Sequence, residues 1–234
     1  PLTLNFHRTD HKDGSATYLR EFLRQYMMAK RPARTDYPSW NYVQFVADSI
    51  AWDSDPLYGW CNKNFKKDGS PYNVYSDGLK VFTTIDSRMQ RYAEEAVYQH
   101  VARYLQPAFD KENKPKPSSP FSDKLTLKQI RAILNRSITQ SERWRTMKAA
   151  GYTPGEINQA FRQKIEMTVF TYHGDIDTLM SPLDSIRYYK EFLRSGFMSM
   201  DPKTGAVKAY VGGLDYPHFM YDMVSLGRRQ VGST

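Results

Sequence analysis

The last eight residues of the chain are GRRQVGST (Gly227–Thr234), and they include Ser233, whose hydroxyl could act as a nucleophile. A serine hydroxyl is a weak nucleophile at neutral pH and needs a neighbouring base to take its proton. The tripeptide Gly-Ser-Thr is also common in plain loops. Ser233 alone therefore does not specify an enzyme, and its interpretation depends on the residues that precede it.

Two further patterns suggest chemistry but have simpler structural interpretations. Glu94 and Glu95 are adjacent carboxylates on an expected helix, where neighbours point about 100° apart and do not converge on one atom. Lys203-Thr204-Gly205 follows Asp201-Pro202, where the fixed φ of proline and the positive φ open to glycine predict a tight turn. We expect a solvated helix face for the first and a plain turn for the second.

Two groups of metal-ligating residue types are present, His7 with His11 and Asp175 with Asp177. The first pair would share a helix face, but Asp13-Gly14 favours a loop there. The second pair resembles a turn between strands and offers too few oxygen ligands for calcium. We expect no metal site and no cofactor.

Composition narrows the function classes. The 234 residues are 40% hydrophobic and 25% charged, enough for a packed core in one large or two small domains. The net charge of +8 is compatible with an anionic partner, but no block of five or six like charges and no nucleic-acid motif occurs. We expect no nucleic-acid partner. Cys61 is the single cysteine, which excludes an internal disulfide.

Both ends of the sequence are expected to be cut from something longer. The chain begins with Pro1 rather than methionine, and no signal peptide is evident. No run of 18 apolar residues is present, so the sequence predicts no membrane span in these 234 residues.

Hydrophobic spacing predicts a mixed sequence of helices and strands. Tyr18–Met27 has helical spacing, with Ser15 as the expected N-cap, and a second helix is expected in WNYVQFVADSIAW. Leu79–Ile85 is rich in β-branched and aromatic residues and predicts a strand. A long helix is expected over Ser87–Leu105, and DKENKPKPSSP (110–120) is expected to be a loop.

The second half continues in the same way. A helical stretch is expected from about Thr126 to Arg162, interrupted at 151–155, and MTVFTYHGDIDTLM predicts two strands joined by a turn. Ser181 is the expected N-cap of a helix that begins at Pro182 and ends before Gly196. FMSMDPKTGAVKAYVGG predicts a hairpin over 197–213.

Three long segments carry a resemblance to a known family. They are YGWCNKNFKKDGSPYNVYSDGLKVFTTIDSRMQRYAEEAV, SPLDSIRYYKEFLRSGFMSMDPKTGAVKAYVGG and YDMVSLGRRQVGST. In these segments the chain resembles class A penicillin-binding proteins, the two-headed enzymes that build peptidoglycan, and looks most like those of Bacteroidetes. The resemblance implies that the last segment is the approach to the active-site serine, which the family continues as Phe-Lys-Pro.

The resemblance also implies an organisation. We expect an α+β fold, with a helix-rich inter-domain linker or pedestal in residues 1–196 and an insertion at about 110–165. Residues 197–234 would be the first β-hairpin and start of the penicillin-binding transpeptidase domain, truncated within its Ser-x-x-Lys motif. A glycosyltransferase domain and a membrane anchor would precede Pro1. The resemblance implies that the full-length parent protein acts in the periplasm and is anchored to the inner membrane.

The implied chemistry is peptidoglycan cross-linking. In this family the nucleophile opens Ser-x-x-Lys, so Ser233 matches the nucleophile and the lysine would fall two positions after Thr234. Ser233 would attack D-Ala-D-Ala stem peptides, form an acyl-enzyme and pass it to an amine, and β-lactams would trap the same serine. Cell-wall regulatory proteins are further expected partners. The fragment alone is predicted to be inactive.

An alternative remains open for this chain. Its basic, tyrosine-rich region 1–196 would then be a non-catalytic module that docks cell-wall polymer or a regulatory partner. A folding expectation accompanies both interpretations: a lone two-stranded hairpin is marginal in water, so residues 214–234 are predicted to be poorly ordered or to pack differently from the intact enzyme.

Overall fold

The computed structural model describes residues 14–227. The described residues divide into two compact units, one made of 14–94 and 196–227 and the other of 95–195. The elements up to residue 160 are helices, and two separate two-stranded antiparallel sheets follow with one helix between them, which confirms the α+β expectation at that level. None of the helices in the described range is long and apolar enough to cross a bilayer.

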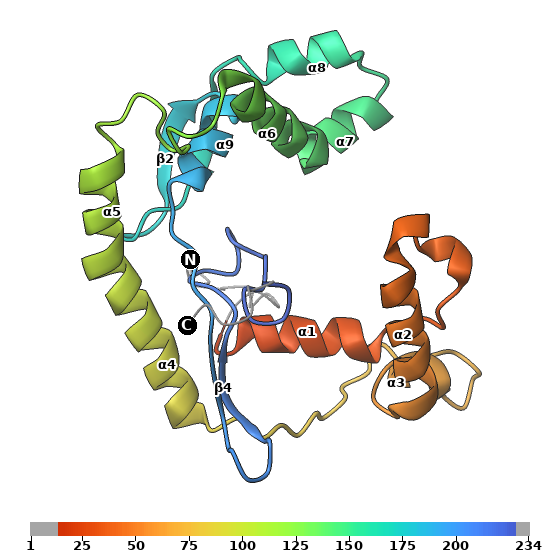
Figure 1. Cartoon of the computed structure of the whole chain (residues 1–234). Coiled ribbons are helices and arrows are strands. Elements are labelled where there is room, and N and C mark those ends of the chain that lie inside the picture. Colours follow the sequence, from red (N-terminus) through yellow and green to blue (C-terminus); the bar gives the residue numbers. More distant parts are fainter. Residues whose placement is uncertain (1–13, 228–234) are drawn as a thin grey trace, which may run out of the picture. The chain divides into compact units, whose positions relative to one another are not determined.

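The first unit begins with helix α1 (Thr17–Met27), which contacts strand β4 (Val207–Val211) and helix α3 (Trp60–Lys63) (Figure 1). The expected N-cap is wrong: the cap position is Ala16, at φ 54°, and it makes no side-chain cap bond. The hydroxyl of Ser15 instead donates to the carboxylate of Glu94, 3.1 Å away. The Ser15 hydroxyl therefore bonds to a carboxylate far away in the sequence and does not cap α1.

The rest of this unit's N-terminal part is a run of short helices. The expected second helix is present as α2 (Tyr42–Ser54), preceded by two 3-10 turns, η1 (Arg34–Asp36) and η2 (Ser39–Asn41). Cys61 of α3 is 1% exposed, and burial raises the pKa of its thiol. Trp40 is 82% exposed, so it is not part of the core.

The strand expected at Leu79–Ile85 is wrong. No strand is present there, although Thr84 donates through its hydroxyl to the carbonyl of Val207 at 2.8 Å. Strand propensity reflects the fit of side chains to a half-buried pleated surface. Phe82 is 93% exposed and Val81 is 42% exposed in this segment, so these two side chains have no half-buried surface to fit.

The expected hairpin is confirmed. Strand β3 (Phe197–Met200) pairs antiparallel with β4, with Met198 opposite Tyr210 and an irregularity between Ser199 and Met200. The turn at Lys203-Thr204-Gly205 is also confirmed, because the Asp201 carboxylate accepts the backbone N–H groups of Lys203 and Thr204 and Gly205 has φ +73°. Those two N–H donors lower the pKa of Asp201.

The expected helix Ser87–Leu105 is present but continues further than predicted. Helix α4 (Ser87–His100), a π-helix (Val101–Leu105) and α5 (Gln106–Asn113) follow one another directly. Pro107 lacks the N–H of a regular helix and its ring conflicts with the carbonyl four residues earlier. The wider π-turn just before it accommodates the proline, so the helix goes on into part of the segment expected to be a loop.

Three helices fill the next stretch, in agreement with the helical expectation for 126–162. They are α6 (Leu127–Gln140), α7 (Glu142–Ala149) and α8 (Pro154–Ala160). Capping boxes at Thr126 and Thr153 begin α6 and α8, and Ser141 caps α7. Gly151, at φ +90°, makes the turn between α7 and α8.

The core of the second unit lies between these helices and α9 (Pro182–Lys190). Its buried centre consists of Ile138, Ile157 and Phe161, and partly buried Trp144, Met147, Leu183 and Ile186 pack around it. Trp144 is thus a half-buried side chain that packs against the core. Strands β1 (Ile165–Val169) and β2 (Ile176–Met180) pair antiparallel, and Ser181 caps α9 as predicted.

Candidate functional sites

Ser233 lies outside the described residues, as do His7 and His11. The structure does describe the approach to the serine as far as Gly227. We use the term approach below for residues 212–227, which belong to the first unit together with α1 and the β3–β4 hairpin.

Buried hydrogen bonds hold the approach in place. The Tyr18 hydroxyl on α1 donates to the carbonyl of Phe219 at 2.6 Å, and the Tyr210 hydroxyl on β4 donates to the Asp222 carboxylate at 2.6 Å. The other oxygen of Asp222 accepts the backbone N–H of Val224 at 2.8 Å. These bonds tie the approach to α1 and to β4.

The electrostatics of Tyr210 follow from its surroundings. Burial raises the pKa of its phenol, and the hydrogen bond to Asp222 raises that pKa further. Both side chains are buried, at 6% and 7% exposed. The phenol is therefore a neutral donor at neutral pH, and its hydrogen bond joins β4 to the approach.

Glycines let the chain leave β4 close to α1. A Cβ atom on Gly212 would lie 2.6 Å from a ring carbon of Tyr18, and one on Gly213 would lie 2.7 Å from Cζ of the same ring and collide with its hydroxyl. The Tyr18 ring therefore occupies the space that any larger residue would need. The sequence GG at the end of the hairpin is a packing requirement of this contact.

A buried glutamine completes the anchorage of β4. Gln90 on α4 is 1% exposed. Its Nε2 donates to the carbonyl of Tyr210 at 2.8 Å, and its Oε1 accepts the N–H of the same residue at 2.7 Å. The side-chain amide thus pairs with β4 as a neighbouring strand would. Composition and spacing gave no signal for this role.

The expectation for Glu94 and Glu95 is confirmed in one respect and wrong in another. They do not converge: Glu95 bonds to Gln99, one turn along the helix. Glu94, however, is not on a solvated face, because it accepts the N–H of Ala16 at 2.8 Å and the Nε2 of Gln90 at 2.8 Å. It fixes the start of α1 beside α4.

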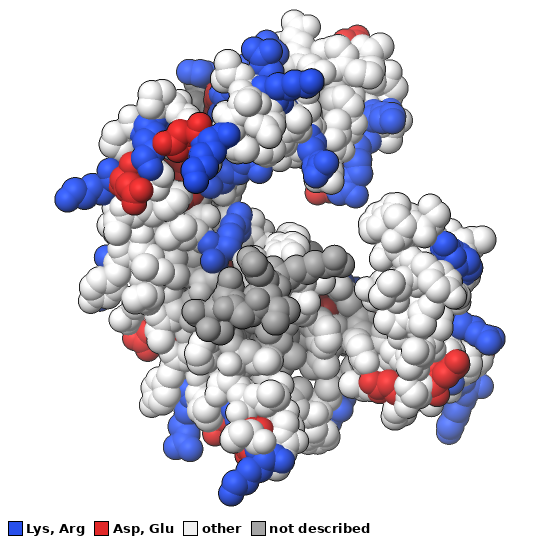
Figure 2. All heavy atoms as spheres, viewed as in Figure 1, with Lys and Arg blue, Asp and Glu red and all other residues white. Residues whose placement is uncertain are grey.

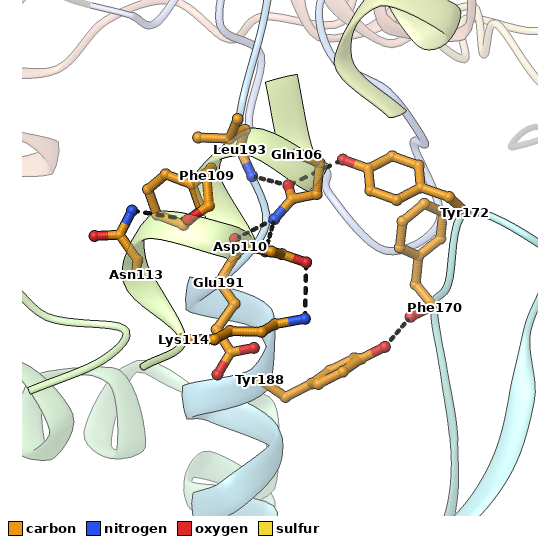
Figure 3. Close-up of polar contacts among 10 residues, drawn as sticks. All are labelled: Gln106, Phe109, Asp110, Asn113, Lys114, Phe170, Tyr172, Tyr188, Glu191 and Leu193. Atoms are coloured by element: carbon orange, nitrogen blue, oxygen red, sulfur yellow. Dashed lines mark hydrogen bonds and ion pairs between the residues drawn. The ribbon is translucent and has the colours of Figure 1, made fainter. Parts of the chain in front are cut away.

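A second polar centre lies in the other unit, around Gln106 (Figure 3). Gln106 is 5% exposed and every polar position of its amide is used. Its Nε2 donates to Asp110 at 2.7 Å and to the carbonyl of Glu191 at 2.9 Å. Its Oε1 accepts the N–H of Leu193 at 2.9 Å and the hydroxyl of Tyr172 at 3.3 Å.

Aromatic rings and an ion pair surround this amide (Figure 3). Phe170, Tyr172, Tyr188 and Phe192 contact one another with ring centroids 5.1–5.6 Å apart. Asp110 also pairs with Lys114 at 2.7 Å. Burial raises the pKa of Tyr172 to about 12. A cavity of about 490 Å³ opens beside these groups.

The centre at Gln106 has the character of a structural joint. Its donors and acceptors are satisfied internally, and the Asp110 carboxylate, which lines the cavity, accepts from Gln106 and pairs with Lys114. Among the described residues, no three His, Cys, Asp or Glu side chains gather as metal ligands. Asp177 bonds instead to the Thr168 hydroxyl across the β1–β2 hairpin.

Part of the second unit is similar to a known protein family. Residues 116–193 match the family described as the penicillin-binding protein middle domain. This matched segment includes most of the region 110–165 that we expected to be an insertion. Among the motifs of the sequence, SPLDSIRYYKEFL lies within it.

Two curated relatives extend the comparison. The chain is 26% identical over 181 residues to penicillin-binding protein 1A of Rickettsia bellii, a match that covers 70% of this chain and 22% of that protein. It is 26% identical over 189 residues to penicillin-binding protein 1A of Neisseria flavescens, which covers 73% and 23%. The chain spans less than a quarter of these relatives' length. No solved structure gives a significant match. The matches support the class A penicillin-binding protein family.

Proposed function

We propose that this chain is a portion of a bifunctional peptidoglycan synthase, in which residues 1–196 form the inter-domain pedestal and 197–234 begin the transpeptidase domain. Ser233 is the acyl-enzyme nucleophile, and its partner lysine stands two positions after Thr234. An upstream glycosyltransferase domain and membrane anchor place the protein in the periplasm at the inner membrane. Within the family, the motifs are nearest to those of Bacteroidetes.

The reaction follows from the serine–lysine pairing. The lysine amine takes the Ser233 proton as Oγ attacks the carbonyl of the penultimate D-Ala of a stem peptide. The bond to the terminal D-Ala breaks, that residue leaves with a proton, and an ester to Ser233 remains. An amine of a second stem peptide then attacks the ester and releases the serine. A β-lactam carbonyl is attacked in the same way, and its opened ring keeps the ester in place.

The observation that carries the proposal is that the GRRQVGST motif resembles the same family of penicillin-binding proteins to which the middle-domain match and the curated relatives belong. The anchored approach supports it. Tyr18, Asp222 and Gln90 fix β4 and residues 212–227, so the chain enters the serine motif from a defined position.

A fluorescent penicillin tests the proposal. We expect it to label a protein extended past Thr234 through the transpeptidase domain, and to leave the 234-residue chain unlabelled. Ser233→Ala should abolish labelling, whereas Thr234→Ala, which removes the adjacent hydroxyl, should retain it. Labelling that survives Ser233→Ala would exclude Ser233 as the nucleophile. An extended protein that folds but takes no label would leave the non-catalytic docking module as the better interpretation.

A further inference from the structure

A cavity of about 430 Å³ lies in the second unit, where α6, α8 and α9 meet. Its floor is apolar and its rim is cationic and amide-bearing. The floor consists of Leu134, Ile138, Phe161 and Leu183, and the rim of Arg131, Arg162, Arg187, Asn135 and Asn158. This volume is in the range of pockets that hold small ligands or a few residues of a peptide.

The three guanidinium groups reach the cavity from three different elements. Arg131 is on α6, Arg162 follows α8 and Arg187 is on α9, and all three are exposed. The Nη1 atom of Arg187 lies 3.3 Å from Oδ1 of Asp184. This ion pair is exposed, and exposed ion pairs contribute little to stability. Within residues 14–227, Arg131 and Arg162 make no ion pair, so two full cationic charges face the cavity uncompensated.

The surrounding charge has the same sign. Residues 124–164 contain nine Lys and Arg and two Asp and Glu, which accounts for most of the chain's net charge of +8. Figure 2 shows blue atoms crowded over the α6–α8 part of the visible face, with few red ones. One of the two acids, Glu156, is engaged in the capping box of α8. The field around the cavity therefore favours an anionic ligand.

We propose that this cavity binds an acidic peptide segment of a partner protein. Guanidinium groups pair with carboxylates in a bidentate geometry, which suits aspartate and glutamate side chains. The asparagine amides on the rim both donate and accept, as a peptide bond requires. The apolar floor receives an aliphatic side chain. A phosphate polymer would use the cations and leave the floor and the amides without a role.

This inference goes beyond peptidoglycan cross-linking, because it does not use Ser233 and needs no enzymatic activity. It assigns residues and ligand chemistry to the docking role that the sequence left open. Its failure and the failure of the proposed reaction are separate outcomes, since penicillin labelling does not report on this cavity.

The test measures fluorescence anisotropy of a labelled, acetylated peptide that alternates Asp and Glu with Leu, added to the 234-residue chain at physiological ionic strength. We expect binding, and Arg131→Gln and Arg162→Gln should each weaken it roughly tenfold, because each removes a charge-assisted hydrogen bond. Arg136→Gln is the matched control. It removes the same charge from the same helix but does not line the cavity, and should change affinity less than about twofold.

Four results would overturn the inference. The acidic peptide fails to bind, or its Asn/Gln counterpart binds equally well. Arg136→Gln weakens binding as much as Arg131→Gln, which would indicate a diffuse field. Inorganic triphosphate displaces the peptide at equal concentration, which would indicate a phosphate ligand instead. Circular dichroism of each variant confirms that the helices are retained.

Discussion

The hydroxyl of Tyr18 donates a 2.6 Å hydrogen bond to the carbonyl of Phe219, 201 positions later in the chain, and both residues are buried. The bond joins α1 to the segment that leads to Ser233. Removing the donor from a buried carbonyl lowers the free energy of unfolding by about 1–3 kcal/mol. The position of the approach therefore depends on a residue near the other end of the sequence.

Tyr18→Phe should loosen the approach while keeping the ring in place. The reporter is the backbone N–H of Met223, which donates to the carbonyl of Gly212 at 2.8 Å. We expect hydrogen exchange at this amide to accelerate roughly tenfold or more. Tyr221→Phe is the control, because the Tyr221 hydroxyl also bonds a backbone carbonyl, that of Leu226, but at an exposed position. Equal acceleration in both variants would contradict the prediction.

Gly213→Ala should destabilise the first unit by about 1–3 kcal/mol, the usual cost of forcing a side chain into a filled space. The added methyl group meets the Tyr18 ring and hydroxyl. Gly155→Ala is the matched control in the other unit, where the nearest atom outside its neighbours is 3.9 Å away. Urea unfolding followed by circular dichroism measures both. A Gly213→Ala midpoint no lower than that of Gly155→Ala would show that Tyr18 moves aside at little cost.

Local signals in the sequence predict local structure well. The Ser181 cap of α9 and the turn after Asp201 depend on residues within a few positions, and both are present. The Ser15 cap was wrong because Glu94, 79 positions away, takes the hydroxyl. Gln90 and Gln106 were not identified as anchors because their partners lie as far as 120 and 87 positions away. A glutamine on a helix has no periodic sequence pattern that predicts a hydrogen bond to a distant backbone group.

The resemblance to a family can be recognised in the sequence without knowledge of the fold. Its motifs are strings of specific residues that need no fold to be recognised, so the three long segments, the last of which ends in GRRQVGST, indicate a resemblance to penicillin-binding proteins without any geometry. The arginines around the α6–α9 cavity cannot be recognised in this way, since Arg131, Arg162 and Arg187 are spread over 57 residues and converge only after three helices pack.

Gln106→Leu should release the joint between α5 and the chain after α9. Leucine keeps the volume but removes both donors and both acceptors, which leaves the N–H of Leu193 without its 2.9 Å partner. We expect exchange at the Leu193 amide to accelerate roughly tenfold. Gln99→Leu, on α4, is the control, since that side chain bonds only to Glu95 among the described residues. An unchanged Leu193 amide in Gln106→Leu would assign its protection to burial alone.

Tyr172 should make the second unit sensitive to alkali. Burial raises the pKa of its phenol to about 12, above the ordinary value of 10.0, so the folded chain disfavours the ionised form. A raised pKa contributes stability that is fully present below the unfolded value, and this stability is lost as pH rises through the folded value. The affected window therefore runs from about pH 10 to about pH 12.

The comparison of wild type with Tyr172→Phe measures this effect. Urea midpoints followed by circular dichroism are compared at about pH 9 and about pH 11. We expect the wild-type midpoint to fall more than that of Tyr172→Phe, because phenylalanine has no proton to lose. At the lower pH the variant should be the less stable of the two, since it lacks the hydroxyl that donates to Gln106 at 3.3 Å. Parallel alkaline losses in both proteins would mean that other groups, not Tyr172, set the response.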